Sequence, residues 1–321
     1  MRSFFRYFVF LGTAASVLFP FVGAHALTVQ PATVEIQTDP GQGDVKNLKL
    51  TNDSGQTETY FVTIQKFVPN GTNGQQDFLP LSDTKGLPEW IYVDKPQITL
   101  RAGESSNLQV SLRVPPSVAP GGYYAAVFLS KAPSATEPIA MLPRVGVLFF
   151  VRINGNIQEH LTLDSVNVDR ANYEFLPVGF RVSVTNDGMV HETPVGTISI
   201  KNIFGQQVAL LPVNPDAPDA GRVLPASTRI YQSAWTKGDT HPVRGFFDGL
   251  QQELSHFAIG PYVATVTFSG PLFGGDVARQ VRFSVWPWRS LIAFGVLLVV
   301  LVALFVGVKK LIIKGATSKT S

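Results

Sequence analysis

Short alternations of apolar and polar residues run from residue 27 to residue 285, and Gly, Pro, Asn and Asp interrupt them. A period of two predicts half-buried strands, and the interruptions predict turns. One short helix is predicted at 246–256, where Leu250 and Leu254 have helical spacing. The predicted strands are 28–36, 45–51, 59–67, 98–100, 107–114, 122–129, 145–153, 158–168, 177–186, 195–202, 207–211, 229–235, 262–269 and 277–285.

Two short segments recur in the same order in both halves of this pattern. A Thr-Asn-Asp turn at 51–53 returns at 185–187, and a Gly-x-Tyr-x-Ala-x-Val strand start at 121–127 returns at 260–266. The offsets, 134 and 139 residues, are nearly equal. This favours a duplicated domain, although two sandwiches could also reach similar turns independently.

The segment Asn154-Gly155-Asn156 separates the two halves. Many short strands with frequent turn residues are typical of antiparallel sandwiches. We therefore predict an all-β fold of two tandem immunoglobulin-like antiparallel sandwiches, with domain one at 27–155 and domain two at 156–288. In each domain the tyrosine of the Gly-x-Tyr segment, Tyr123 or Tyr262, is predicted to tie its hydroxyl to nearby backbone, as in a tyrosine corner. Simple amphipathic packing of the two rings is the alternative.

The longest apolar run lies near the C-terminus, at 291–308, and contains no charge. As a helix it would be about 27 Å long, close to the thickness of a bilayer core. It predicts a transmembrane helix at 289–310 and a basic cytoplasmic tail at 311–321; a buried core helix is the alternative. The expected membrane-interface residues are Trp286, Trp288 and Arg289 before the run, and Lys309 and Lys310 after it.

The N-terminus has the features of a secretory signal peptide. Arg2 and Arg6 precede an apolar stretch at 8–22, and Ala24-His25-Ala26 is a small-x-small cleavage site. We predict a signal peptide at 1–26, with a retained anchor as the alternative. Because lysines follow the C-terminal helix, the chain is expected to cross the cell membrane once, with both sandwiches outside and the C-terminus inside.

Charge and composition argue against several classes of function. Seven of the 26 basic residues lie in the two end segments, which hold no acidic residue, so the exported part carries 19 basic and 23 acidic side chains. The basic surplus therefore predicts no nucleic-acid partner. There is no cysteine, and the histidines lack metal-ligand spacing. Together with the absence of a nucleophile or phosphate-loop motif, this predicts no metal, no cofactor and no enzymatic activity.

The long connection at 69–88 is the first candidate for a partner contact, because long loops on a rigid sandwich are frequent binding sites. We expect this connection to lie on the flank of domain one. The candidate binding residues are Asn70, Asn73, Gln75, Gln76, Asp77 and Phe78.

Immunoglobulin strand order also predicts the orientation of the domains. The last strand enters Trp286 without a linker, so the connection at 237–260 should lie beside the bilayer. Its aromatic residues, among them Phe246 and Phe247, either contact lipid headgroups or cap the core. The turn at 270–275 should then face domain one. The distal tip should consist of 53–56 and 132–138.

A series of short motifs extends over residues 28–155. They are Pro31-x-x-Val34-Glu35, Asn52 after an alternating strand, Glu89-Trp90-Ile91, Ile98-Thr99-Leu100, Gly103-Glu104, Val114-Pro115-Pro116, the 121–127 segment, Arg144-Val145-Gly146 and Val151-Arg152-Ile153-Asn154-Gly155. Together they resemble the immunoglobulin-like, peptidoglycan-binding domain of the bacterial WxL-interacting cell-surface proteins, a domain similar in outline to pilus-chaperone sandwiches. Residues 157–285 match the family's second domain only in outline. No wall-contacting residue can be carried over.

The resemblance implies a membrane-anchored bacterial cell-surface protein that is not an enzyme. Its expected partner is cell-wall peptidoglycan or a surface protein such as one of WxL type. The alternative is an extracytoplasmic chaperone or assembly factor that uses the edge strands of its sandwiches.

Overall fold

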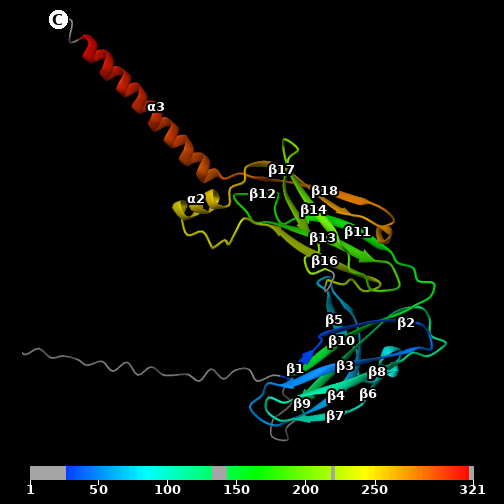
Figure 1. The fold of residues 1–321 in the computed structure, drawn as a ribbon. Coiled ribbons are helices and arrows are strands. Elements are labelled where there is room, and N and C mark those ends of the chain that lie inside the picture. Colours follow the sequence, from blue (N-terminus) through cyan, green and yellow to red (C-terminus); the bar gives the residue numbers. More distant parts are fainter. Residues whose placement is uncertain (1–26, 132–142, 218–220, 318–321) are drawn as a thin grey trace, which may run out of the picture.

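The protein is described by a computed structural model that covers residues 27–131, 143–217 and 221–317, with side chains as far as residue 310. Two β-sandwiches follow one another, and a long helix leaves the second (Figure 1). The predicted all-β fold of two tandem antiparallel sandwiches with one C-terminal apolar helix is confirmed. The predicted signal peptide at 1–26 and the distal segment at 132–138 lie outside the described residues.

Domain one consists of two facing sheets. The first contains, in order, β1 (Leu27–Gln30), β3 (Gly43–Asn52), β8 (Ser105–Arg113) and β6 (Ile91–Val93). The second contains β2 (Thr33–Thr38), β10 (Arg144–Ile153), β9 (Gly121–Lys131), β4 (Glu58–Asn70) and β5 (Gln75–Phe78), and β7 (Gln97–Leu100) also pairs with β4. A short helix, α1 (Leu87–Trp90), adds Trp90 to the core between the sheets.

Domain two repeats this plan. One sheet contains β11 (Leu161–Val168), β13 (Val178–Asn186) and β16 (Ser227–Trp235). The other contains β12 (Asn172–Tyr173), β18 (Val277–Val285), β17 (Gly260–Phe268), β14 (Gly196–Asn202) and β15 (Gln207–Pro212). The domain also has α2 (Phe246–Ser255), close to the predicted helix, and a 3-10 turn, η1 (Pro271–Phe273).

The likeness between the two halves extends to strand pairing and to single side chains. In both domains an early strand pairs in parallel with the last strand, β2 with β10 and β12 with β18. Asn52 and Asn186, which end β3 and β13, are both fully buried. Each donates its side-chain amide to a carbonyl four residues on, Gln56 or Val190, and to a carbonyl much farther along the chain, Leu100 or Val223. Each also accepts a backbone N–H two residues on. These hydrogen bonds hold the turn that each Thr-Asn-Asp motif predicted.

The predicted tyrosine corners are present in both domains. The Tyr123 hydroxyl donates to the Ala119 carbonyl at 2.9 Å. The Tyr262 hydroxyl lies 3.1 Å from both the carbonyl and the amide nitrogen of Ile259. In each case the hydroxyl fastens the strand to backbone three or four residues upstream.

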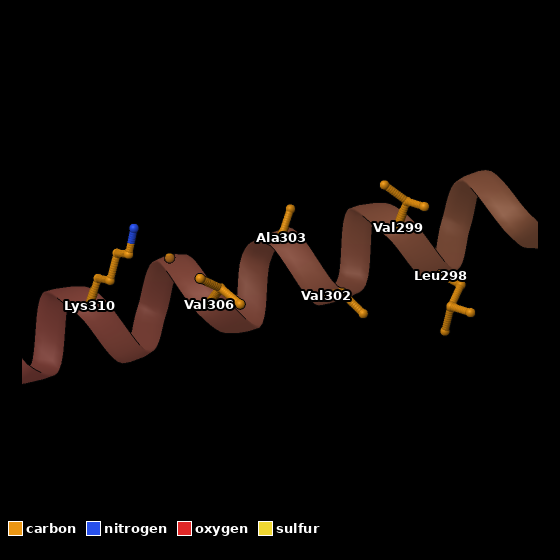
Figure 2. Close-up of a pocket in the computed structure, with 7 residues that line it drawn as sticks. Leu298, Val299, Val302, Ala303, Val306 and Lys310 are labelled. Carbon is orange, nitrogen blue, oxygen red and sulfur yellow. The ribbon is translucent and has the colours of Figure 1, made fainter.

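The C-terminal helix, α3 (Trp288–Thr317), stands away from the sandwiches (Figure 1). Its Trp288–Lys310 segment has a mean hydropathy of 3.2, and beyond its first residues, which contact α2, it is not buried against any other described part of the chain. By length and composition it could cross a membrane. Figure 2 shows Leu298, Val299, Val302, Ala303 and Val306 projecting from the helix toward solvent. Side chains of this kind are suited to lipid rather than water.

Candidate functional site

The joint between the domains is an ordered contact with an apolar part and a polar part. In the apolar part, Leu224 of domain two is buried against an aromatic cluster of domain one. Phe67 and Phe150 are 5.5 Å apart between ring centroids, and Phe150 also packs against Tyr124 at 5.7 Å. Beside this cluster lies a groove of about 510 Å³, which Lys66 and Lys85 border on the domain-one side.

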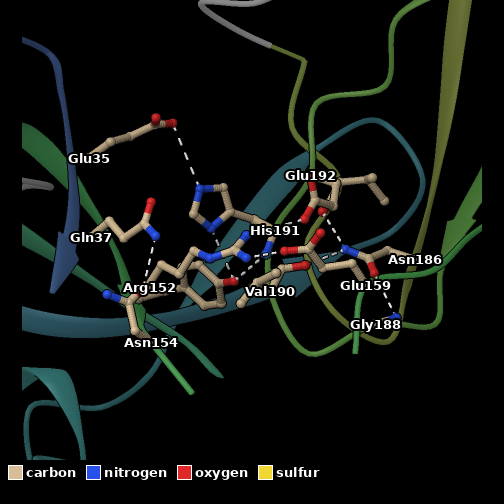
Figure 3. Close-up of polar contacts among 12 residues, drawn as sticks. Glu35, Gln37, Arg152, Asn154, Glu159, Asn186, Gly188, Val190, His191 and Glu192 are labelled. Atoms are coloured by element: carbon tan, nitrogen blue, oxygen red, sulfur yellow. Dashed lines mark hydrogen bonds and ion pairs between the residues drawn. The ribbon is translucent and has the colours of Figure 1, made fainter. Parts of the chain in front are cut away.

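The polar part of the joint brings together charged groups from both domains (Figure 3). The backbone N–H of His191 donates to the Tyr124 hydroxyl at 2.9 Å, and the N–H of Gly122 donates to the Met189 carbonyl, also at 2.9 Å. Arg222 of domain two pairs with Glu35 of domain one. These bonds cross from strands of domain one to the segments around β13 and β16, so they fix the angle between the domains.

A single guanidinium at the joint serves two carboxylates. Arg152, at the end of β10, pairs with Glu159 of the connecting segment and lies 3.6 Å from Glu192 of domain two. Burial raises the pKa of Glu192 to about 7; Glu159 adds to the rise, and Arg152 opposes it. Because Glu159 takes the closer contact with Arg152, Glu192 lacks a full counter-charge and holds its proton into the neutral range.

His191 is shifted in the opposite sense. Burial lowers its pKa to about 4, the nearby Glu35 opposes the shift, and Arg222 and Arg152 add to it. The stability that neutral His191 contributes is therefore present above about pH 6.5 and is lost as the pH falls toward 4. The contribution of Glu192 is present below about pH 4.5 and is lost as the pH rises toward 7. Over the shared range the two contributions oppose each other.

The predicted binding segment is a hairpin at this joint, and the expectation that it lies on the flank of domain one was wrong. The β4–β5 hairpin rises toward β16 of domain two (Figure 1), where the Thr72 carbonyl accepts the N–H of Ile230 at 2.7 Å. Phe78 is half-buried and packs against Phe128, with ring centroids 4.8 Å apart. The hairpin thus braces the two domains.

The other five candidate residues lie along the same hairpin. The Asn70 amide donates to Asp77 at 2.7 Å, and the Gln76 amide donates to the Gly74 carbonyl at 2.9 Å. Asn73 borders a hollow of about 250 Å³ formed with domain two, and Gln75 is exposed. A partner contact at these residues stays a prediction.

A second hollow, of about 340 Å³, lies at the end of domain one farthest from domain two. Ser54, Gly55 and Gln56 of the turn after β3 border it, together with Glu58 and Lys131. The Lys131 ammonium donates to Glu58 at 2.6 Å, and this hydrogen bond, more than any other contact, lowers the pKa of the Glu58 carboxyl. This distal hollow contains the described part of the tip that the sequence predicted.

Domain two is fastened to α3 by a buried carboxylate that the sequence analysis missed. Glu253, on α2, is fully buried and accepts the backbone N–H of Ser290 at 2.6 Å. It also accepts the backbone N–H of Arg289 at 3.2 Å and pairs with the Arg289 guanidinium at 3.1 Å. The first N–H groups of a helix have no partner within it, so Glu253 satisfies them and complements the helix dipole.

The predicted membrane-interface residues lie at the two ends of the apolar segment of α3. Trp286 and Trp288 are exposed at the start of α3, and Phe246 of α2 packs against Trp288 with ring centroids 6.0 Å apart. Arg289 differs from the other four because its side chain is mostly covered: its guanidinium pairs with Glu253 and, at 2.6 Å, with Glu174. Lys309 and Lys310 are exposed at the far end of the apolar segment. The segment at 237–260 contains α2, which contacts the start of α3 through Glu253. Its predicted place beside a bilayer stays a prediction.

The turn at 270–275 does not form the joint. Phe273 of η1 is buried in the core of domain two and stacks on Phe268, with ring centroids 4.4 Å apart. The contacts described above come instead from β16 and from the segments that follow β13 and precede β16. Over the described part of the chain, no group of three or more metal-ligating side chains is found.

No protein-family model matches the sequence, and no curated protein matches it. Among solved structures, the class 5 fimbriae chaperone CfaA is similar over 79% of this chain and 98% of its own, at 10% identity and a TM-score of 0.37. The CupB2 chaperone of Pseudomonas aeruginosa covers the same shares at 13% identity and a TM-score of 0.36. The E. coli chaperone DraB is 14% identical over 82% of this chain and 98% of its own, with a TM-score of 0.34. These values describe a loose likeness in fold.

Proposed function

We propose that this protein is a single-pass bacterial membrane protein whose sandwiches lie outside the cell and bind a partner without catalysis. Domain one holds cell-wall peptidoglycan, or a surface protein such as one of WxL type, and α3 keeps it at the membrane. The observation that carries the proposal is the continuous series of ordered contacts from domain one through the joint to Glu253 and α3. Order of this kind favours binding, because a pre-arranged site loses less conformational entropy.

The ends of α3 support the proposed orientation. Tryptophans gather at the end next to domain two and lysines at the other, which is the arrangement of a helix whose lysine end is cytoplasmic. Because β18 ends at Val285 and α3 begins at Trp288, only Trp286 and Pro287 separate sandwich from helix. Domain one is then held at one height above the bilayer.

The distal hollow is the proposed contact with the partner. It lies at the end of domain one opposite the joint, because Lys131 ends β9 and Gly122, near the start of the same strand, contacts Met189 of domain two. Its border offers hydroxyl, amide, carboxylate and ammonium groups from Ser54, Gln56, Glu58 and Lys131. Such groups can hydrogen-bond the hydroxyls and amides of a glycan with peptide stems.

Sedimentation with purified peptidoglycan tests the proposal. The full chain in detergent micelles should pellet with the polymer, and Gly55→Trp, which fills the hollow, should reduce the pelleted fraction. Gly245→Trp is the matched control, because a Cβ at either glycine meets no atom within 4 Å. Wild-type protein that stays in the supernatant contradicts peptidoglycan binding. Equal pelleting of wild type and Gly55→Trp contradicts the distal hollow alone.

An assembly factor is the second candidate, and β15 is the observation that favours it. This strand is an edge of its sheet and exposes Val208 and Leu210. An apolar edge can pair with an extended segment of an exported client. If this is the function, the full chain should slow the aggregation of a fibre subunit, and Leu210→Lys should abolish the effect. A full chain without effect on aggregation contradicts this candidate.

A further inference from the structure

The β14–β15 hairpin ends in two large apolar side chains with no place in the core. Ile203 is 62% exposed and Phe204 is 79% exposed. Their turn is firmly held: Asn202 accepts the backbone N–H groups of Phe204 and Gln206, both at 3.0 Å, and Gly205 supplies a φ of +76°. A positive φ suits glycine. The fold therefore holds two apolar side chains in water at an ordered tip.

Strand register places this tip at the membrane end of domain two. Asn202 of β14 pairs with Tyr262 near the start of β17, and Gly260 of β17 pairs with Val285 at the end of β18. The chain enters α3 three residues after Val285. The tip and the start of α3 therefore lie at the same end of one sheet, and Figure 1 shows the loop above β14 and β17 on the side from which α3 leaves.

A second apolar projection shares this end of the domain. Phe247 of α2 is 82% exposed, and its neighbour Phe246 contacts Trp288 of α3. Around the hairpin tip the charge also suits lipid headgroups, because the only ionisable residue between 195 and 212 is Lys201. Exposed aromatic and aliphatic side chains beside a lysine are the composition of segments that lie in a membrane interface.

We infer that Ile203 and Phe204 insert into the headgroup region of the same bilayer that holds α3. Domain two then rests on the membrane at the hairpin tip and at α2, in addition to its covalent anchor. Contacts on different elements prevent the domain from tilting about the start of α3. The inference rests on the proposed membrane span, and it adds a lipid contact that α3 alone does not require.

The absence of cysteine allows a direct test with single nitroxide labels in the full chain. Phe204→Cys is the test site. Val195→Cys is the matched control, because Val195 is 68% exposed but lies next to Gly196, at the opposite end of the same strand. Val299→Cys reports on α3. Each labelled protein is placed in vesicles of phosphatidylcholine and phosphatidylglycerol, and collisions with oxygen and with a polar nickel chelate are measured by power saturation.

The ratio of oxygen to nickel collisions should be several-fold higher at residue 204 than at residue 195, and highest at residue 299. Equal ratios at 204 and 195, with 299 in lipid, would overturn the inference and leave the anchor intact. A polar environment at 299 would overturn the anchor and the inference together. Spin–spin broadening at 204 that disappears on dilution with unlabelled protein would show that a second copy covers the tip, which also overturns the inference.

Discussion

Replacing Glu253 by glutamine tests how firmly domain two is joined to α3. The side chain keeps its size but loses its charge, and one of its two acceptor oxygens becomes a donor. In the native protein these oxygens accept from the Ser290 and Arg289 amides and from the Arg289 guanidinium. With glutamine, at least one buried N–H loses its acceptor, and the new amide group faces the guanidinium.

The expected cost follows from these contacts. Hydrogen bonds to a charged group contribute about 1.5–3 kcal/mol each, and breaking a buried ion pair from one side costs about 3–5 kcal/mol. Because glutamine keeps one acceptor, we expect the docking of α2 on α3 to weaken by about 3 kcal/mol. At about 1.4 kcal/mol per factor of ten, local opening should become about a hundredfold more frequent.

Hydrogen exchange at the amides of residues 249–255 measures this opening in the full chain in lipid nanodiscs. Glu174→Gln is the matched control, because it pairs with the same guanidinium but its side chain is 49% exposed. An exposed ion pair contributes about 1 kcal/mol or less, so exchange should change by less than tenfold. If Glu253→Gln exchanges like wild type, Glu253 does not hold the helix and the reasoning is refuted.

Four further substitutions test the sandwiches and their joint. Asn186→Ala removes buried bonds to the Val190 and Val223 carbonyls and should lower the free energy of unfolding in urea by about 3 kcal/mol; an unchanged midpoint contradicts the role of Asn186. Tyr262→Phe should cost about 1 kcal/mol in thermal unfolding, and an unchanged Tm contradicts the corner. In Glu192→Gln only the lowered pKa of His191 remains, so the free energy of unfolding should increase as the pH rises from 4.5 to 6.5. In His191→Gln only the raised pKa of Glu192 remains, so the free energy of unfolding should decrease over the same pH range. Each change should be about 3 kcal/mol at most. Equal pH slopes in the two variants contradict the opposing contributions.

Local patterns in the sequence predicted the sandwiches, because strands depend on alternation over a few residues. The Thr-Asn-Asp turns and the Gly-x-Tyr segments were also predictable from short motifs, because the Asn52 and Tyr123 side chains donate hydrogen bonds to backbone carbonyls four residues away. The apolar C-terminal helix was predicted from an equally local pattern, a single uninterrupted apolar run. These features needed no knowledge of which strands meet in space.

The joint could not be predicted, because its members are far apart in the chain. Glu35 meets Arg222, which lies 187 residues later, and both belong to otherwise ordinary polar positions of their segments. The burial of Glu253 could not be predicted either, because a glutamate on a short helix is usually exposed. Its burial becomes favourable only through its contacts with the start of α3. The β4–β5 hairpin was predicted only as a long connection on the flank of domain one, because its contact with Ile230 depends on the angle between the domains.

Distance measurement between domain one and α3 tests most directly whether the protein holds its distal hollow at one height. Gly55→Cys beside the hollow and Leu291→Cys in α3 can be labelled with nitroxides, and the distance distribution can be measured by double electron–electron resonance in lipid nanodiscs with deuterated buffer. A single narrow distribution is predicted, and eight flexible residues inserted after Val285 should broaden it. A wild-type distribution as broad as that of the insertion variant would contradict the fixed height.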